Sequence, residues 1–108
     1  MTGLLDTSVD ILRDLVAFDT TSRNSNMPLI DYVADYLSDQ GCAPRIIPSE
    51  DGTKANLFCT IGPDIAGGVV LSGHSDVVPV DGQDWSTDPF DLTEADGNDK
   101  IILKDGAD

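Results

Sequence analysis

Apolar residues recur at helical spacing in two segments near the start of the chain. A helix from Thr7 or Ser8, either of which can cap it, to about Phe18 is predicted by four residues that share one face: Ile11, Leu12, Leu15 and Val16. A second helix is predicted to begin after Asn26 as its cap and to end before Gly41, a residue suited to the left-handed position after a helix. The polar segment 19–26 between them is interpreted as a turn, with a loop at the rim of a site as the alternative.

Short runs of apolar and β-branched residues predict strands in the rest of the chain, at 45–47, 55–61, 69–71 and 100–104. A turn at Asp51-Gly52 separates the first two. The run from Val69 to Leu71 lies between glycines and contains no polar residue, which is typical of a strand buried on both faces of a parallel sheet. The pattern therefore predicts an α/β fold, in which helices flank a mostly parallel or mixed sheet.

The only histidine of the chain follows the third predicted strand. Side chains alternate along extended backbone, so His74 and Asp76 should point to the same side. Ligands bind at the carboxyl ends of strands in open α/β sheets, and a metal-bound imidazole commonly donates its second N–H to a carboxylate. His74 is therefore a candidate metal ligand and Asp76 its orienting partner. A hydrogen-bonded structural pair explains the same two residues, and the spacing alone leaves both interpretations open.

The composition is strongly acidic. The chain has 20 acidic residues, of which 18 are Asp, and six basic residues, so the net charge is −14 over 108 residues. Such a charge repels phosphate backbones and anionic lipids, so nucleic acid and membrane surfaces are excluded as partners. A protein from a salty environment and an ordinary acidic bacterial enzyme both fit this charge. The two cysteines, Cys42 and Cys59, are expected to be reduced thiols in a cytoplasmic protein.

Several segments together resemble a known family. The segment Leu71-Ser72-Gly73-His74-Ser75-Asp76-Val77-Val78-Pro79 is similar to the first metal-ligand motif of the zinc-dependent aminoacylase, deacetylase and dipeptidase family. Three flanking segments resemble the branch of that family that removes the acetyl group from N-acetyl-L-ornithine, a step of arginine biosynthesis: 18–26, 54–58 and 81–90.

The resemblance implies a fold, a cofactor and a reaction. It implies a zinc-exopeptidase-like sheet that carries two zinc ions, or cobalt in their place. His74 would bind one metal, Asp76 would orient His74, and Asp108 falls near the position of the acid that bridges the two ions. A terminal solvated carboxylate is the alternative for Asp108. The reaction implied is hydrolysis of the amide of a small N-acyl amino acid, in a full-length protein that is expected to be a homodimer.

The family's remaining ligands, its general-base Glu and its dimerisation domain have no counterpart in the chain. Residues 1–108 are therefore expected to be the N-terminal portion of a catalytic metal-binding domain, inactive alone. Two alternatives stay open. One is a sibling amidohydrolase, either a succinyl-diaminopimelate desuccinylase, an aminoacylase or a dipeptidase. The other is a non-catalytic acidic binding domain.

Overall fold

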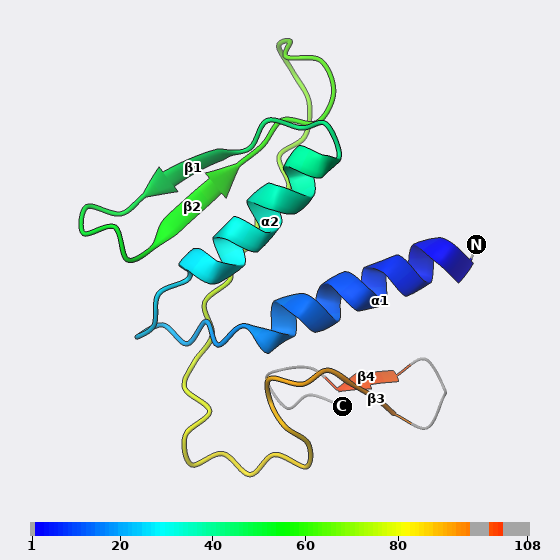
Figure 1. The fold of residues 1–108 in the computed structure, drawn as a ribbon, viewed down its shortest axis with the longest axis vertical. Helices are drawn as coiled ribbons and strands as arrows, with labels where there is room; N and C mark the ends of the chain where they lie inside the picture. Colours follow the sequence, from blue (N-terminus) through cyan, green and yellow to red (C-terminus); the bar gives the residue numbers. More distant parts are fainter. Residues whose placement is uncertain (1, 96–99, 103–108) are drawn as a thin grey trace. The chain divides into compact units, whose positions relative to one another are not determined.

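The computed structural model describes residues 2–95 and 100–102. Two helices precede four short strands, in the order α1 (Thr2–Ala17), α2 (Met27–Asp39), β1 (Arg45–Pro48), β2 (Ala55–Phe58), β3 (Thr93–Ala95) and β4 (Lys100–Ile102) (Figure 1). The chain divides into two compact units, one from Thr20 to Val77 and one made of the segments on either side of it. Each unit is described by itself.

In the unit 20–77, α2 packs against the antiparallel hairpin of β1 and β2 (Figure 1). Ile30 and Ala34 lie four residues apart, so they share one face of α2, and both are buried. Ala55 at the start of β2 is buried as well. Burial of a side chain such as Ile30 contributes roughly 1.5–3 kcal/mol, so the apolar face of α2 helps to hold the helix on the hairpin.

The end of α2 follows the prediction. Gly41 has φ of +84°, its N–H donates to the Ser38 carbonyl at 3.0 Å, and the Cys42 N–H donates to the Leu37 carbonyl at 3.0 Å. These two bonds form a Schellman motif, which satisfies carbonyls left unpaired at a helix end. The prediction of Gly41 as the left-handed residue is therefore confirmed.

Asn26 precedes α2 as predicted, but its side chain makes no capping hydrogen bond. Instead the amide joins the backbone of Ala55 twice: Nδ2 donates to the Ala55 carbonyl at 2.9 Å, and Oδ1 accepts from the Ala55 N–H at 2.9 Å. The expected cap is therefore a cross-link between the start of α2 and the start of β2. An amide can do this because it carries a donor and an acceptor side by side.

The β1–β2 hairpin has Arg45 opposite Phe58 and Pro48 opposite Ala55. Its loop contains the predicted turn at Asp51-Gly52, where Gly52 has φ of +73°. The Asp51 carboxylate accepts hydrogen bonds from the Thr53 N–H and hydroxyl and from the Ser49 hydroxyl. These bonds lower the pKa of Asp51, with the Thr53 N–H as the largest cause.

In the other unit, α1 begins at Thr2, about five residues before the predicted cap. Thr7 and Ser8 lie inside the helix and donate to the carbonyls of Gly3 and Leu4, so the prediction that either begins the helix is wrong. Val16 of the predicted apolar face is buried. Strands β3 and β4 pair antiparallel; β4 confirms Lys100–Ile102 of the predicted last strand, and positions 103 and 104 lie outside the described residues.

The α/β class is confirmed, but the described residues do not form a mostly parallel sheet. Both sheets are two-stranded and antiparallel, and the parallel pairing found in the described part of the chain is one bridge, between Thr21 and Val77. The predicted interior strand 69–71 is wrong. Val69, Val70 and Leu71 are 87, 78 and 94% exposed and pair with no described strand. An apolar run forms a buried strand only where neighbouring strands supply its hydrogen-bond partners.

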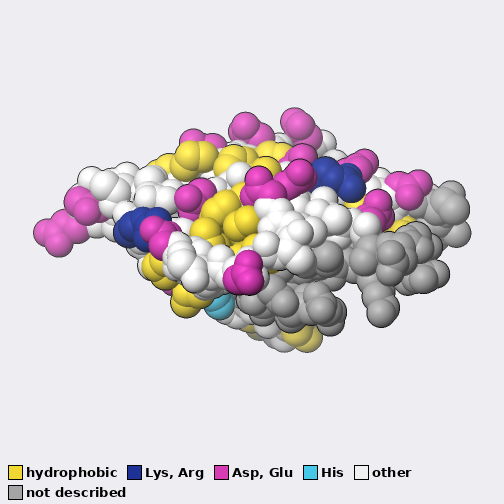
Figure 2. Space-filling model, turned by 90° about the horizontal axis from the view of Figure 1, so that it is seen from below, with side chains coloured by type: hydrophobic (Ala, Val, Ile, Leu, Met, Phe, Trp, Pro, Cys, Tyr) yellow, Lys and Arg dark blue, Asp and Glu magenta, His cyan; other side chains and the backbone are white. Residues whose placement is uncertain are grey.

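On the face shown in Figure 2, acidic side chains are prominent among the described residues and Lys and Arg are sparse. One basic residue of α1, Arg13, lies 3.3 Å from Asp10 and 3.9 Å from Glu94. These pairs are exposed and contribute little to stability. Among the described helices, neither is long and apolar enough to cross a membrane.

Candidate metal-binding site

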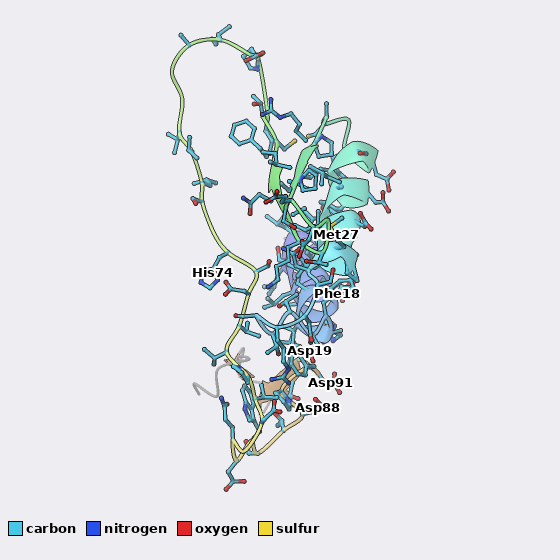
Figure 3. The ribbon with its side chains drawn as sticks, turned by 90° about the vertical axis from the view of Figure 1, so that its left-hand side faces the viewer. Phe18, Asp19, Met27, His74, Asp88 and Asp91 are labelled. Atoms are coloured by element: carbon cyan, nitrogen blue, oxygen red, sulfur yellow. The ribbon has the colours of Figure 1, made fainter. Side chains whose placement is uncertain are left out.

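The two residues singled out by spacing lie together. His74 Nδ1 is 2.8 Å from Asp76 Oδ1, on an extended segment that carries both side chains on one side. Figure 3 shows the His74 side chain projecting from that segment. Both side chains are largely exposed, at 82% for His74 and 59% for Asp76. With Nδ1 turned to the carboxylate, Nε2 is the ring nitrogen left to meet a ligand.

Asp76 has a second partner that the spacing did not indicate. The Ser22 hydroxyl donates to Asp76 Oδ2 at 3.0 Å, while Oδ1 faces the imidazole. The Ser22 hydrogen bond is the largest cause of the lowered pKa of Asp76, and the His74 ring is the next. Each carboxylate oxygen is therefore engaged, which fixes the carboxylate plane against the ring.

The segment that carries the site is joined to residues 20–22 by backbone hydrogen bonds. The Ser22 N–H donates to the Val77 carbonyl at 3.0 Å, and the Val77 N–H donates to the Thr20 carbonyl at 3.1 Å. The Thr20 hydroxyl donates to the Ser75 carbonyl at 2.6 Å. We call these three residues, Thr20 to Ser22, the clamp.

Segment 19–26 contains the predicted turn, in which the Asn24 N–H donates to the Thr21 carbonyl at 2.7 Å. Thr20 and Thr21 are among the most buried residues described, at 3 and 1% exposure. The alternative, a loop beside the site, fits the structure as well, because the clamp bonds to Ser75 and Val77. Lys54 reaches the clamp from the hairpin, because its ammonium donates to the Ser22 carbonyl. No pattern within the segment indicated these contacts, because the partners of the clamp lie 32, 54 and 55 positions away.

His74 and Asp76 line a cavity of about 840 Å³ within the unit 20–77. One wall is apolar and comes from α2 and the hairpin, with Leu29, Val33, Ile47 and Leu57. Polar groups on the lining include Asn26, Lys54 and Asn56. An apolar wall with a few polar groups near a titratable pair is the usual composition of a small-molecule site.

The donor set fits one position of a metal site. A neutral imidazole oriented by a carboxylate is a common metal ligand. Within residues 2–95 and 100–102, no group of three or more His, Cys, Asp or Glu side chains could hold a metal ion. Asp108, the third candidate, lies outside the described residues. The described part of the chain thus contains a candidate ligand and its support, not a whole site.

Comparison with known proteins finds three relatives that carry the same name. Acetylornithine deacetylase from Pasteurella multocida (strain Pm70) is 46% identical over 74 residues, which are 68% of this chain and 19% of that protein. The enzymes of the same name from Shigella sonnei (strain Ss046) and Proteus mirabilis (strain HI4320) are 39 and 38% identical over 105 and 100 residues. These alignments cover 90 and 86% of this chain.

The chain spans only 19–27% of the length of these relatives. No protein-family model matches it, and no solved structure matches it significantly.

Proposed function

Because the chain belongs by sequence to the acetylornithine deacetylase family, we propose that it is part of a metal-dependent amidohydrolase that removes the acetyl group from N-acetyl-L-ornithine. The His74–Asp76 pair is the observation that carries the chemistry. The names of the relatives support the acetylated substrate over those of sibling amidohydrolases. The strongly acidic surface gives no support to an anionic partner such as nucleic acid.

In this proposal His74 holds a divalent ion through Nε2, with zinc as the expected metal and cobalt as a substitute. Such an ion, when bound, polarises an amide carbonyl and lowers the pKa of a bound water. Asp76 keeps the imidazole in the Nδ1–H tautomer, and the Ser22 hydroxyl keeps Asp76 in place. The apolar wall of the cavity gives room for a small N-acyl amino acid.

A catalytic zinc needs three protein ligands and an open position. We propose that the other ligands belong to parts of a longer protein beyond this stretch, together with a dimerisation domain and a homodimeric assembly. The 108-residue chain alone is then inactive toward N-acetyl-L-ornithine. The free thiols of Cys42 and Cys59 support a cytoplasmic location.

Zinc titration by calorimetry of the longer protein that contains this chain tests the site. His74→Ala should abolish the specific component of binding. Asp76→Asn should weaken it by roughly 10–100-fold, the usual effect of losing a carboxylate partner of a metal-bound histidine. Asp84→Asn, which removes an exposed acid elsewhere, is the matched control and should leave binding unchanged. Binding that responds equally to all three variants would indicate diffuse attraction to carboxylates and contradict the proposal.

Activity is tested on the longer protein that contains this chain. It should hydrolyse N-acetyl-L-ornithine faster than N-succinyl-diaminopimelate or dipeptides, and His74→Ala should abolish the reaction. A preference for either of the other substrates would contradict the proposed substrate but not the proposed metal site. Full activity in the His74→Ala protein would contradict the proposed substrate and the proposed metal site together.

A further inference from the structure

The two cysteines lie side by side, although they are 17 positions apart. Cys42 ends the Schellman motif at the end of α2, where its N–H donates to the Leu37 carbonyl. Cys59 follows the last residue of β2 directly. Because Arg45 pairs with Phe58 in the hairpin, the chain just before β1 runs beside the chain just after β2. The register thus brings the two thiols to the same end of the hairpin.

The two side chains are near each other there. Cys42 and the backbone of Ala43 lie close enough to Cys59 to act on the pKa of its thiol. Cys59 Sγ lies 3.9 Å from the Thr60 carbonyl oxygen, a weak S–H donor contact. Both cysteines are free and half-buried, so a small reagent can reach them while the backbone around them is fixed.

We propose that Cys42 and Cys59 form a dithiol that is oxidised to an intramolecular disulfide by peroxides. The inference stands on the hairpin register, which brings both cysteines to one end of the hairpin, and it does not depend on the proposed function. One sulfur attacks a peroxide oxygen, and the O–O bond breaks to give a sulfenic acid and water. The second sulfur then attacks the sulfenic sulfur, the S–S bond forms, and a second water leaves. Two thiols and one hydrogen peroxide give one disulfide and two waters.

The surroundings of Cys59 set how readily this happens. Burial, and then the neighbouring Cys42, raise the pKa of the Cys59 thiol above its ordinary value. The thiolate is the reactive form, so the pair resists brief exposure to oxidant and reacts under sustained exposure. Its partner is already in place, so a sulfenic acid formed on either sulfur is captured within the molecule.

The disulfide would join the end of α2 to the end of β2 and close a loop that contains the whole β1–β2 hairpin. A disulfide that closes a loop of this length restricts the unfolded chain and so stabilises the folded one, provided that the native geometry is not strained. We therefore expect the oxidised chain to unfold at a temperature higher by on the order of 10 °C.

The test treats the dilute, reduced 108-residue chain with excess hydrogen peroxide and measures intact mass under non-reducing conditions. The monomer should lose about 2 Da, the mass of the two hydrogens removed on disulfide formation. Peptide mapping should recover residues 42 and 59 in one cross-linked fragment. Cys42→Ser and Cys59→Ser, each with one thiol left, should instead gain oxygen or form disulfide-linked dimers. Circular dichroism of the reduced variants checks that both still fold.

Three results would overturn the proposal. One is a wild-type chain that gives only disulfide-linked dimers at low concentration. Another is a chain whose thiols are oxidised separately to sulfinic acids. The third is an oxidised monomer that unfolds at a lower temperature than the reduced one, which would show that the native positions of the sulfurs do not fit a disulfide.

Discussion

Removal of the Asn26 amide tests how the unit 20–77 is joined. In Asn26→Ala the two hydrogen bonds to Ala55 are lost, while the helix start keeps the backbone bond from the Ile30 N–H to the residue 26 carbonyl. The Ser25 hydroxyl still accepts from the Met27 N–H. The substitution therefore removes the link between α2 and β2 and leaves the first turn of α2 largely intact.

The expected loss follows from the two bonds. A typical intramolecular hydrogen bond contributes about 0.5–1.5 kcal/mol net, and an unsatisfied buried polar group costs more. Ala55 is 6% exposed, so water reaches its N–H and carbonyl poorly once the amide is gone. We expect Asn26→Ala to lower the free energy of unfolding by about 2 kcal/mol. With a urea dependence of about 2 kcal/mol per molar, the midpoint should fall by about 1 M.

Urea unfolding followed by far-ultraviolet circular dichroism measures this shift. Asn56→Ala is the matched control, because Asn56 lies one position further along β2 and its side chain is exposed. The control should move the midpoint by less than a quarter as much. Asn26→Asp should also destabilise, because a carboxylate can accept from the Ala55 N–H but cannot donate to its carbonyl. A midpoint for Asn26→Ala equal to that of Asn56→Ala would refute the cross-link.

The remaining predictions concern single positions. Gly41→Ala should destabilise by about 1–2 kcal/mol, because φ is +84° and the added Cβ meets no atom that could compensate. Gly3→Ala, in open space within α1, should instead stabilise by up to about 1 kcal/mol. Urea unfolding of the Gly41→Ala and Gly3→Ala variants should show opposite changes in the free energy of unfolding. The pKa of Asp51 is lowered in the folded chain, so its contribution to stability is present above the unfolded value of about 3.9 and is lost as pH falls through the folded value. Asp51→Ala should therefore unfold more easily than wild type at pH 7, and the difference should shrink as the pH falls below about 4 in a series of urea titrations. In a nitrogen-15 spectrum, the single histidine should show the Nδ1–H tautomer, and Asp76→Asn should shift the ring toward a tautomer mixture.

Features fixed by local chemistry were predictable from the sequence. Gly41 ends α2 because a left-handed residue is needed where the last carbonyls require partners, and that signal lies within a few residues. The start of α1 was misplaced for an equally local reason. Hydroxyls such as that of Thr7 can cap a helix or bond back to a carbonyl four residues earlier, and the sequence does not say which.

Features that depend on distant partners were not predictable. The run 69–71 has the composition of an interior strand, but its burial depends on strands to either side, and none among the described residues pairs with it. Likewise, Asn26 carries a good capping side chain that bonds to Ala55, 29 positions away. A single-residue preference of about 1 kcal/mol is easily outweighed by two tertiary hydrogen bonds.

The geometry of His74 and Asp76 has a different origin from the one that the sequence indicated. The spacing argument placed the pair at the end of a buried parallel strand, yet the strand is not formed and the pair is still made. What orders it is the clamp. Its backbone bonds to Val77 hold the segment beside the buried Thr20 and Thr21, and its exposed Ser22 hydroxyl holds the carboxylate. The candidate ligand and its orienting acid are thus held together within the unit 20–77. Support of this kind distinguishes an ordered pair from a histidine and an aspartate that are merely near each other in sequence.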